Sequence, residues 1–162
     1  MGFSSFINEL DLTNTNDTEV DYVIVNDNNY DFSRFNDSYI CCEVFGSNYY
    51  NGEFLGISFI SNKKNIFITL DGIIANTSLK DYLEDNQKIK KTFDLKKLYV
   101  ALKKHNIEIQ NVTYDMLLAA YLINPGYANE DLKKVANEFK INNIDYDDAI
   151  YGSKSKAAVP SS

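Results

Sequence analysis

The chain has 162 residues, of which 44% are hydrophobic, which is enough for one domain with its own core. Its formal net charge is -7 at pH 7 and its isoelectric point is about 4.7. Because phosphate contacts need clustered Lys and Arg, this balance excludes strong nonspecific binding of DNA by the chain alone. No apolar run approaches the ~18 residues of a membrane span, and the N-terminus has no signal-peptide pattern. We therefore expect a cytoplasmic protein with no membrane partner.

The first twenty residues are predicted to form a segment of their own. Phe3, Phe6 and Leu10 could share one side of a short amphipathic turn. Residues 12–20 are rich in Asn, Thr and Asp, which is typical of a flexible linker. The sequence therefore predicts a segment and linker over 1–20 and a domain over 21–162.

Strand patterns dominate the first part of the domain. Residues 22–25 predict a short strand, and residues 38–45, 53–61 and 64–70 predict three longer ones. The connections between these three are short and rich in turn-forming residues, which favours an antiparallel meander. A short helix over 78–84 and a fourth main strand over 89–93 are predicted to follow.

The strongest helical pattern begins directly after residue 93. Leu95, Leu98, Tyr99 and Leu102 recur at the 3.6-residue period and form one apolar stripe. Asp94 is a suitable N-cap before this helix, and Asn106 can end it in a left-handed conformation.

A second helix is predicted after a short extended link. Residues 107–109 alternate like a strand, and Asp115 is expected to cap a helix over 116–123 that Asn124 and Pro125 terminate. This helix is apolar nearly all round, so we expect it to be buried between other layers. A further helix is predicted after Asn129, with the apolar stripe Leu132, Val135, Ala136 and Phe139. Periodicity alone indicates one sheet with helices packed on it, α/β or α+β.

Three motifs in this region resemble the 3′–5′ exonuclease domain of bacterial family A DNA polymerases. The family motifs are Asn-Leu-Lys-Tyr-Asp, Gly-Ile-Glu-Leu and Phe-Asp-Thr-Met-Leu-x-Ser-Tyr-Leu-Leu-Asn-Pro. The matching segments here are residues 94–98 (DLKKL), 106–109 (NIEI) and 114–125 (YDMLLAAYLINP). The resemblance covers roughly residues 39–160. It implies an α/β ribonuclease H-like fold with a mixed sheet, in which three antiparallel strands are followed by strand–helix alternation.

The resemblance also implies where a metal site would lie. Active members of this family cleave the terminal phosphodiester with two divalent metal ions, which need several converging carboxylates. The family supplies them from Asp-x-Glu on the first long strand, the Asp of Asn-Leu-Lys-Tyr-Asp, and Tyr-x-x-x-Asp on a late helix. The first three positions are Glu43, Phe45 and Leu98 in this chain, and the late helix would follow Pro160. Only one carboxylate remains, and a single acid does not hold two divalent ions.

We therefore expect a vestigial exonuclease site with no intact catalytic residue, no metal ligand set and no cofactor of its own. Magnesium would serve active relatives and the parent polymerase. We expect the former site to be packed, with Phe45 near Leu98 and Glu43 at the edge. The losses fit the branch of the family whose exonuclease domain is inactive, and residues 149–154 (AIYGSK) are similar to the following loop of that branch.

The resemblance implies a scaffold role in DNA replication and repair. The segment would link the 5′-nuclease and polymerase domains of a parent DNA-directed DNA polymerase and reach DNA through that parent. We expect the C-terminal helices of the domain to be missing. Two other functions stay open. One is an active metal-dependent 3′–5′ exonuclease completed by missing C-terminal residues, and the other is a stand-alone protein-interaction module.

Other polar residues have simpler interpretations. His105 follows two lysines at a predicted helix C-terminus, where a solvated cation suits the helix dipole, although catalysis or metal binding stays open. Asp145, Asp147 and Asp148 lack the pattern of a calcium loop and predict a solvated turn.

The two cysteines, Cys41 and Cys42, are adjacent in a strand pattern, with no second cluster. This arrangement favours two small buried apolar side chains in a reducing compartment over a zinc site or a disulfide.

Overall fold

The computed structural model describes residues 21–46, 48–127, 132–138, 147–152, 156 and 158–159. The predicted segment over 1–20 lies outside these residues, as do Asn129 and Phe139 of the last predicted helix. The domain limits proposed from the sequence therefore stay a prediction.

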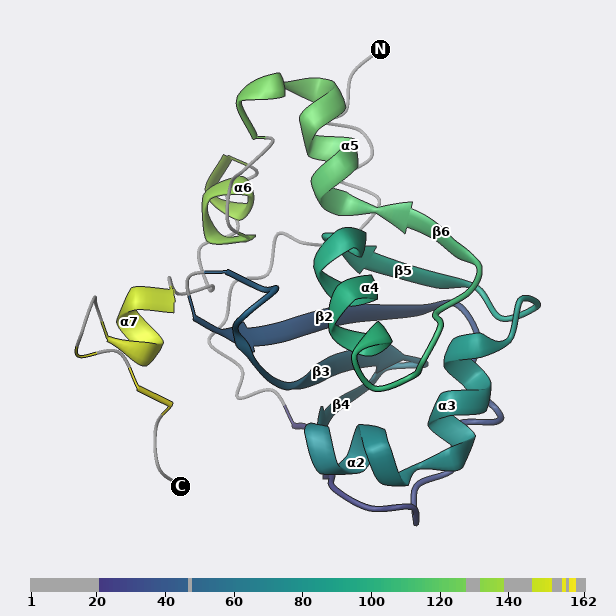
Figure 1. Cartoon of the computed structure of the whole chain (residues 1–162). Helices are drawn as coiled ribbons and strands as arrows, with labels where there is room; N and C mark the ends of the chain where they lie inside the picture. The colour runs from purple at the N-terminus through teal and green to yellow at the C-terminus, as the bar shows by residue number, and fades with distance from the viewer. Residues whose placement is uncertain are drawn as a thin grey trace.

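A six-stranded mixed sheet organises the described residues, with the strand order β1-β4-β3-β2-β5-β6 (Figure 1). The three predicted long strands form the antiparallel meander β2 (Ser38–Phe45), β3 (Glu53–Ser61) and β4 (Lys64–Thr69). The short strand β1 (Val23–Val25) pairs parallel with β4. On the other side, β5 (Lys90–Phe93) pairs parallel with β2, and β6 (Val112–Asp115) pairs parallel with β5. The predicted antiparallel meander is confirmed.

The helices lie in two groups around this sheet. The helices α2 (Leu70–Ala75), α3 (Thr77–Glu84) and α4 (Leu95–Lys103) contribute apolar side chains to the main core. The helix α5 (Met116–Ile123) lies beyond β6, and a 3₁₀ turn (Pro125–Tyr127) leads towards α6 (Leu132–Glu138) (Figure 1). The last described helix is α7 (Asp147–Tyr151). Val135 and Ala136 of α6 are buried, as their stripe predicts.

The side chains of strand β2 lie in two different environments, one on each face of the sheet. Its side chains alternate because successive residues of a strand point to opposite faces. Ile40, Cys42 and Val44 are buried on the face that α2, α3 and α4 cover. Cys41, Glu43 and Phe45 are only half-buried on the other face.

The ends of α4 form as the sequence predicts. Asp94 adopts a left-handed backbone with φ of 60°, and its carboxylate accepts a hydrogen bond of 3.0 Å from the amide of Lys97. Asn106 follows the helix with φ of 57°, which reverses the chain direction.

Two element predictions are wrong. The alternating residues 107–109 are not in the sheet: Ile107 and Ile109 are buried, but the amide of Ile107 bonds back to the carbonyl of Leu102 at 3.2 Å. The strand forms five residues later as β6, because the parallel edge of β5 is free there to pair. The helix α2 was not predicted from the sequence; its N-cap Thr69 accepts a 3.2 Å hydrogen bond from the amide of Gly72.

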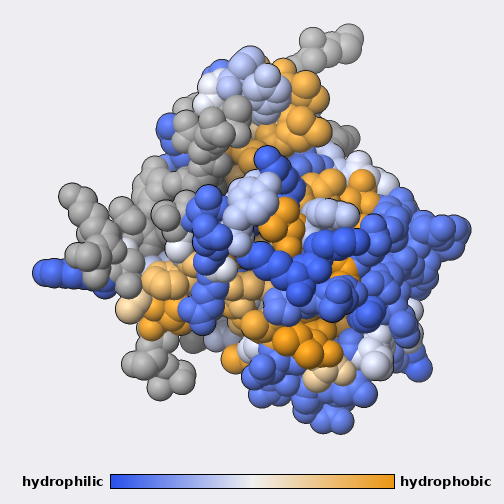
Figure 2. Space-filling view, viewed as in Figure 1, coloured by the Kyte–Doolittle hydropathy of each residue, from blue (hydrophilic) through white to orange (hydrophobic). Residues whose placement is uncertain are grey.

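The expected burial of α5 is also wrong for the described structure. Ala120 is its only buried residue, whereas Leu118, Leu122 and Ile123 are 55%, 76% and 55% exposed. The helix extends from the edge strand β6 (Figure 1), and its main contacts in the described residues are with β5, β6, α6 and the 3₁₀ turn. An apolar surface therefore covers this part of the molecule (Figure 2). None of the described helices is long and apolar enough to cross a membrane.

Lys90 on β5 is fully buried. Its ammonium group donates a 2.6 Å hydrogen bond to the carbonyl of Asp85 and lies 5.1 Å from the ring centre of Tyr82. Burial lowers the pKa of Lys90 to about 8, and the Asp85 charge offsets only part of that effect. The charged form of this side chain is therefore disfavoured by folding.

The buried lysine makes stability depend on pH. Folded Lys90 loses its proton above about pH 8, whereas an unfolded lysine keeps it to about 10.5. Between these values the unfolded chain binds more protons, so stability rises with pH. Lys90→Met removes this titrating group. Relative to that variant, we expect the unfolding free energy of the unchanged chain to increase by about 1–3 kcal/mol as the pH rises through this window. Urea unfolding at several pH values measures it, and a flat difference would contradict the buried lysine.

Leu98 and Leu122 differ in burial, so truncating them to Ala should change the unfolding free energy by very different amounts. Leu98 is fully buried, so Leu98→Ala should cost about 2–5 kcal/mol of unfolding free energy. Leu122 is exposed, so Leu122→Ala should change it by less than about 0.5 kcal/mol. Denaturant unfolding of both variants measures these values. Equal costs would show that α5 is buried in the isolated chain.

Candidate functional site

The residues at the resembled metal-binding positions of β2 lie on one face of the strand. Glu43 and Phe45 are two residues apart on β2, and both are half-buried there. Glu43 pairs across the sheet with Gly56, and the register shifts between Glu43 and Val44. A Cβ atom on Gly56 would lie 2.3 Å from the carbonyl oxygen of Ile68. Strands β3 and β4 therefore approach each other too closely here for residue 56, opposite Glu43, to carry a side chain.

Tyr151 of α7 closes this end of β2. Its hydroxyl group donates a short hydrogen bond to the Oε1 atom of Glu43. Its ring lies 5.3 Å from that of Phe45, at an interplanar angle of 57°. The Tyr151 side chain thus contacts both residues of β2 that stand at the family's metal-ligand positions.

Sequence reasoning missed Tyr151 as a site residue. The motif AIYGSK drew attention to this segment, but only as a loop similar to a family branch. Tyr151 is 108 positions from Glu43, and no local periodicity links residues so far apart. A helical turn over Asp147–Tyr151 brings it to β2.

Leu98, at the third resembled position, lies in the main core. It is fully buried in the cluster that includes Cys42 and Val44. Those two side chains point to the opposite face of β2 from Glu43 and Phe45. The predicted proximity of Phe45 to Leu98 stays a prediction, since the ring contact described for Phe45 is with Tyr151.

Two nearby carboxylates hold helix ends. Asp94 caps α4. Asp115 accepts bonds from the amides of Leu117 at 3.0 Å and Leu118 at 3.5 Å, so its predicted capping of α5 is confirmed. It also accepts bonds from the amides of Asp94 and Leu95, at 3.0 and 2.8 Å. Asp115 therefore joins the starts of α4 and α5.

The electrostatic surroundings of the site favour neutral thiols. Burial raises the pKa of Cys42 to about 12 and also raises that of Cys41. The charge of Lys97 works against this shift, and the carboxylates of Glu43 and Asp94 add to it. Both cysteines are free thiols that stay protonated at neutral pH. They are therefore uncharged and pack as small apolar side chains do.

The donor set around Glu43 is small. Within the part of the chain that the structure describes, no three His, Cys, Asp or Glu residues gather as metal ligands. Glu43 supplies two oxygens, and Tyr151 bonds to one of them. Asp147 and Asp148 begin α7, and Asp145 lies outside the described residues.

The predicted solvation of His105 is wrong in one respect. The residue follows the end of α4, as expected, but it is half-buried. Its ring lies 5.8 Å from that of Phe54. The turn after α4 folds back towards β3, which gives the imidazole an apolar neighbour.

The fold has counterparts among solved structures. Brucella melitensis NrnC is 16% identical, with 87% of this chain and 69% of that one covered and a TM-score of 0.58. Escherichia coli RNase D, an exoribonuclease, is 14% identical, with 88% and 38% covered and a TM-score of 0.60. The chain therefore has a ribonuclease H-like α/β fold, and the predicted fold class is confirmed.

Sequence comparison narrows this class to one family. Residues 40–162 match the family model described as the DNA polymerase I, ribonuclease H-like domain. DNA polymerase I of Bacillus subtilis (strain 168) is 35% identical over 119 residues, which are 74% of this chain and 14% of that protein. DNA polymerase I of Geobacillus stearothermophilus is 36% identical over 118 residues, 73% of this chain and 14% of that protein. The chain belongs to the DNA polymerase I ribonuclease H-like domain family, and it spans about 14% of the length of these relatives.

The contact between Tyr151 and Glu43 can be measured by a double-mutant cycle. Tyr151→Phe removes the hydroxyl and keeps the ring against Phe45, whereas Glu43→Gln removes the charge. Because the acceptor is a carboxylate, we expect a coupling energy of about 1.5–3 kcal/mol in urea unfolding. Tyr50→Phe at an exposed tyrosine is the matched control. Strict additivity of the two changes would contradict the contact.

Proposed function

We propose that this chain is a non-catalytic 3′–5′ exonuclease-like domain of a DNA polymerase I that acts as a scaffold. The observation that carries the proposal is the absence of carboxylates at two positions where active members of the family carry metal ligands. Glu43 remains, but the other two positions hold Phe45 and Leu98. Two divalent ions need several oxygen ligands at one point, and one side chain cannot supply them.

The surroundings of Glu43 support the same conclusion. The Tyr151 hydroxyl takes one carboxylate oxygen, and the Tyr151 ring packs on Phe45. Metal binding would require this hydrogen bond to break and an aromatic contact to open. The two remaining acids near the start of α4, Asp94 and Asp115, are bonded to backbone amides.

The exposed surface of α5 supports the scaffold part of the proposal. Leu118, Leu122 and Ile123 form an apolar surface on a helix whose one buried residue is Ala120. Large exposed apolar patches on folded domains mark surfaces that pack against other protein. The matched relatives are much longer than this chain, so their polymerase and 5′-nuclease parts are the proposed partners. DNA would be reached through the parent chain, whose polymerase activity lies in its other domains.

Retained nuclease activity is the competing function. NrnC and RNase D share the fold, and NrnC has been solved with bound Mg²⁺ at a TM-score of 0.57 to this chain. These structures are 17% and 14% identical, which establishes the fold alone. Residues beyond Ser162 would have to supply the missing ligands for this chain to act in the same way.

A nuclease assay separates the two functions. Single-stranded DNA labelled at its 5′ end is incubated with the chain and Mg²⁺ or Mn²⁺, and its length is followed on a gel. We expect no shortening, because Glu43 alone cannot position the metal ions. The matched control is Glu43→Ala. Cleavage that disappears in this variant would overturn the proposal, whereas cleavage that persists equally comes from a contaminant and leaves inactivity supported.

A further inference from the structure

A hollow on the opposite end of β2 from Glu43 has two cations and an aromatic wall. We call it the Tyr30 pocket; its volume is about 360 Å³, and it is lined by Tyr30, Asp31, Arg34, Phe35, Asn62 and Lys64. Its residues come from the loop before β2, from the turn between β3 and β4, and from the first residue of β4. Ser38, at the start of β2, is five residues or ~16 Å along the strand from Glu43. The pocket is therefore separate from the nuclease-type site.

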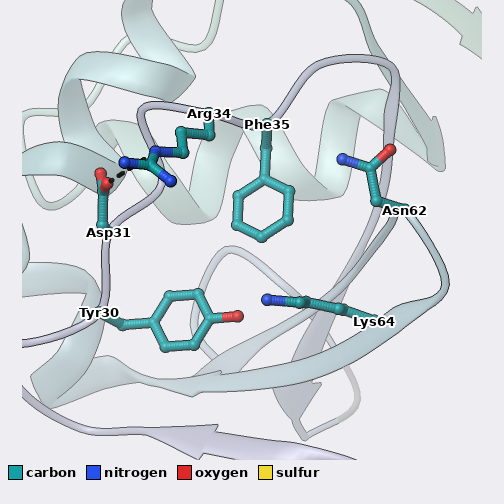
Figure 3. A pocket seen from close by; sticks show the side chains of 6 residues that line it. All are labelled: Tyr30, Asp31, Arg34, Phe35, Asn62 and Lys64. Carbon is teal, nitrogen blue, oxygen red and sulfur yellow. Dashed lines mark ion pairs between the residues drawn. The ribbon is translucent and has the colours of Figure 1, made fainter.

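The rings of Tyr30 and Phe35 and the ends of Asn62 and Lys64 face a common space (Figure 3). The rings of Tyr30 and Phe35 are parallel to within 3°, with centres 6.3 Å apart. The Lys64 ammonium group lies 6.0 and 5.9 Å from these two ring centres, at the outer limit of a cation–π contact. The Arg34 guanidinium group lies beside Asp31 at the edge of the pocket (Figure 3). A planar group with an adjacent negative charge would meet matching partners here.

Buried hydrogen bonds hold the loop that carries Tyr30. The side chain of Asn76 is buried, and its Nδ2 atom donates to the carbonyl of Tyr30 at 2.8 Å. The hydroxyl of Ser78 donates to the same carbonyl at 3.1 Å and accepts a bond from the amide of Phe32 at 3.0 Å. The aromatic wall is thus fixed against the start of α3.

The opposite wall is a tight hairpin turn. Asn62 and Lys63 have φ of 50° and 62°, the left-handed values that a two-residue turn requires. Ser61, directly before them, donates a 3.1 Å hydrogen bond to the carbonyl of Asn36. This bond ties the turn to the loop, so both walls are preformed.

The local charge is positive although the whole chain is acidic. The Asp31 carboxylate accepts a 2.9 Å bond from the amide of Ser33, and its ion pair with Arg34 is long at 4.0 Å. In the described residues Lys64 makes no ion pair. Lys88 bonds to the carbonyl of Ser33 in the same loop and adds a further positive charge. The side chain of Arg34 is 92% exposed, so its long ion pair with Asp31 leaves most of its N–H donors open to an anion.

We propose that the Tyr30 pocket binds a nucleotide unit, a phosphate group next to a planar base. Arg34 and Lys64 would hold the phosphate by charge-assisted hydrogen bonds. The base would stack on Tyr30, and the Asn62 amide would bond to its edge. The unit could be a free nucleotide or part of a single strand, since both carry this chemistry. The inference does not depend on whether the chain cleaves DNA.

Titrations of the full chain followed by amide NMR shifts test the site. The probes are inorganic phosphate, thymidine monophosphate and a short oligothymidylate. We expect the amides of Tyr30, Arg34, Asn62 and Lys64 to shift with thymidine monophosphate, and more weakly with phosphate. If the oligothymidylate binds more tightly than the mononucleotide, the natural ligand is a strand; if it binds equally, a single nucleotide fills the site. Both results support the pocket.

Matched variants decide whether these residues act specifically. The double change Arg34→Gln and Lys64→Gln should weaken binding at least about tenfold, because it removes two charge-assisted bonds. Lys80→Gln, at an exposed lysine of α3 that does not line the pocket, should change binding less than about twofold, since it makes no direct contact there and exposed charges are screened by salt. Tyr30→Leu should weaken thymidine monophosphate more than phosphate, and the double change tests the site even if this variant unfolds.

Three results would overturn the proposal. The first is the absence of saturable shifts at the four amides. The second is equal weakening by Lys80→Gln, which would mean that only net charge matters. The third is equal affinity for phosphate and thymidine monophosphate, which would mean that no base is bound.

Discussion

The alternation of side chains along β2 is the constraint on which the rest of the structure depends. The strand pairs with β3 on one side and β5 on the other, so it lies inside the sheet. One set of its side chains must be apolar, because α4 and the neighbouring strands bury it. The other set, which includes Glu43 and Phe45, is free to change without loss of the core. A chemical site can therefore be altered on one face of β2 while the fold is maintained by the other.

Metal chemistry and packing place opposite demands on that second face. A two-metal site needs several acids close together, and their mutual repulsion is tolerated only while the cations are bound. Without the acids, an aromatic pair such as Phe45 and Tyr151 can cover the strand, and one carboxylate can accept a hydroxyl bond. Under the function proposed above, the same substitutions that remove metal ligands also add contacts to the fold. This coupling would let the domain shape outlast the reaction.

The sequence predicts the parts of the fold that depend on local pattern. The meander β2–β4 and helix α4 follow from alternation and from a 3.6-residue stripe, and the Asp94 and Asp115 caps follow from residue type. The strand β6 could not be predicted in the same way, because only pairing with β5 distinguishes residues 112–115 from the alternating residues 107–109. The exposure of α5 was missed because an apolar helix indicates burial without indicating which protein surface covers it. At the site, motif alignment located Glu43, Phe45 and Leu98, but a contact over 108 positions, such as that of Tyr151, requires the tertiary structure.

Titration of the chain with Mn²⁺ tests the central claim most directly, since paramagnetic broadening of amide signals reports binding without any need for catalysis. The account predicts that the amides of Glu43, Phe45 and Tyr151 broaden no more than those of other exposed acidic regions, with no saturation. Saturable broadening centred on Glu43, abolished by Glu43→Ala, would show that a metal site survives there and would contradict the account.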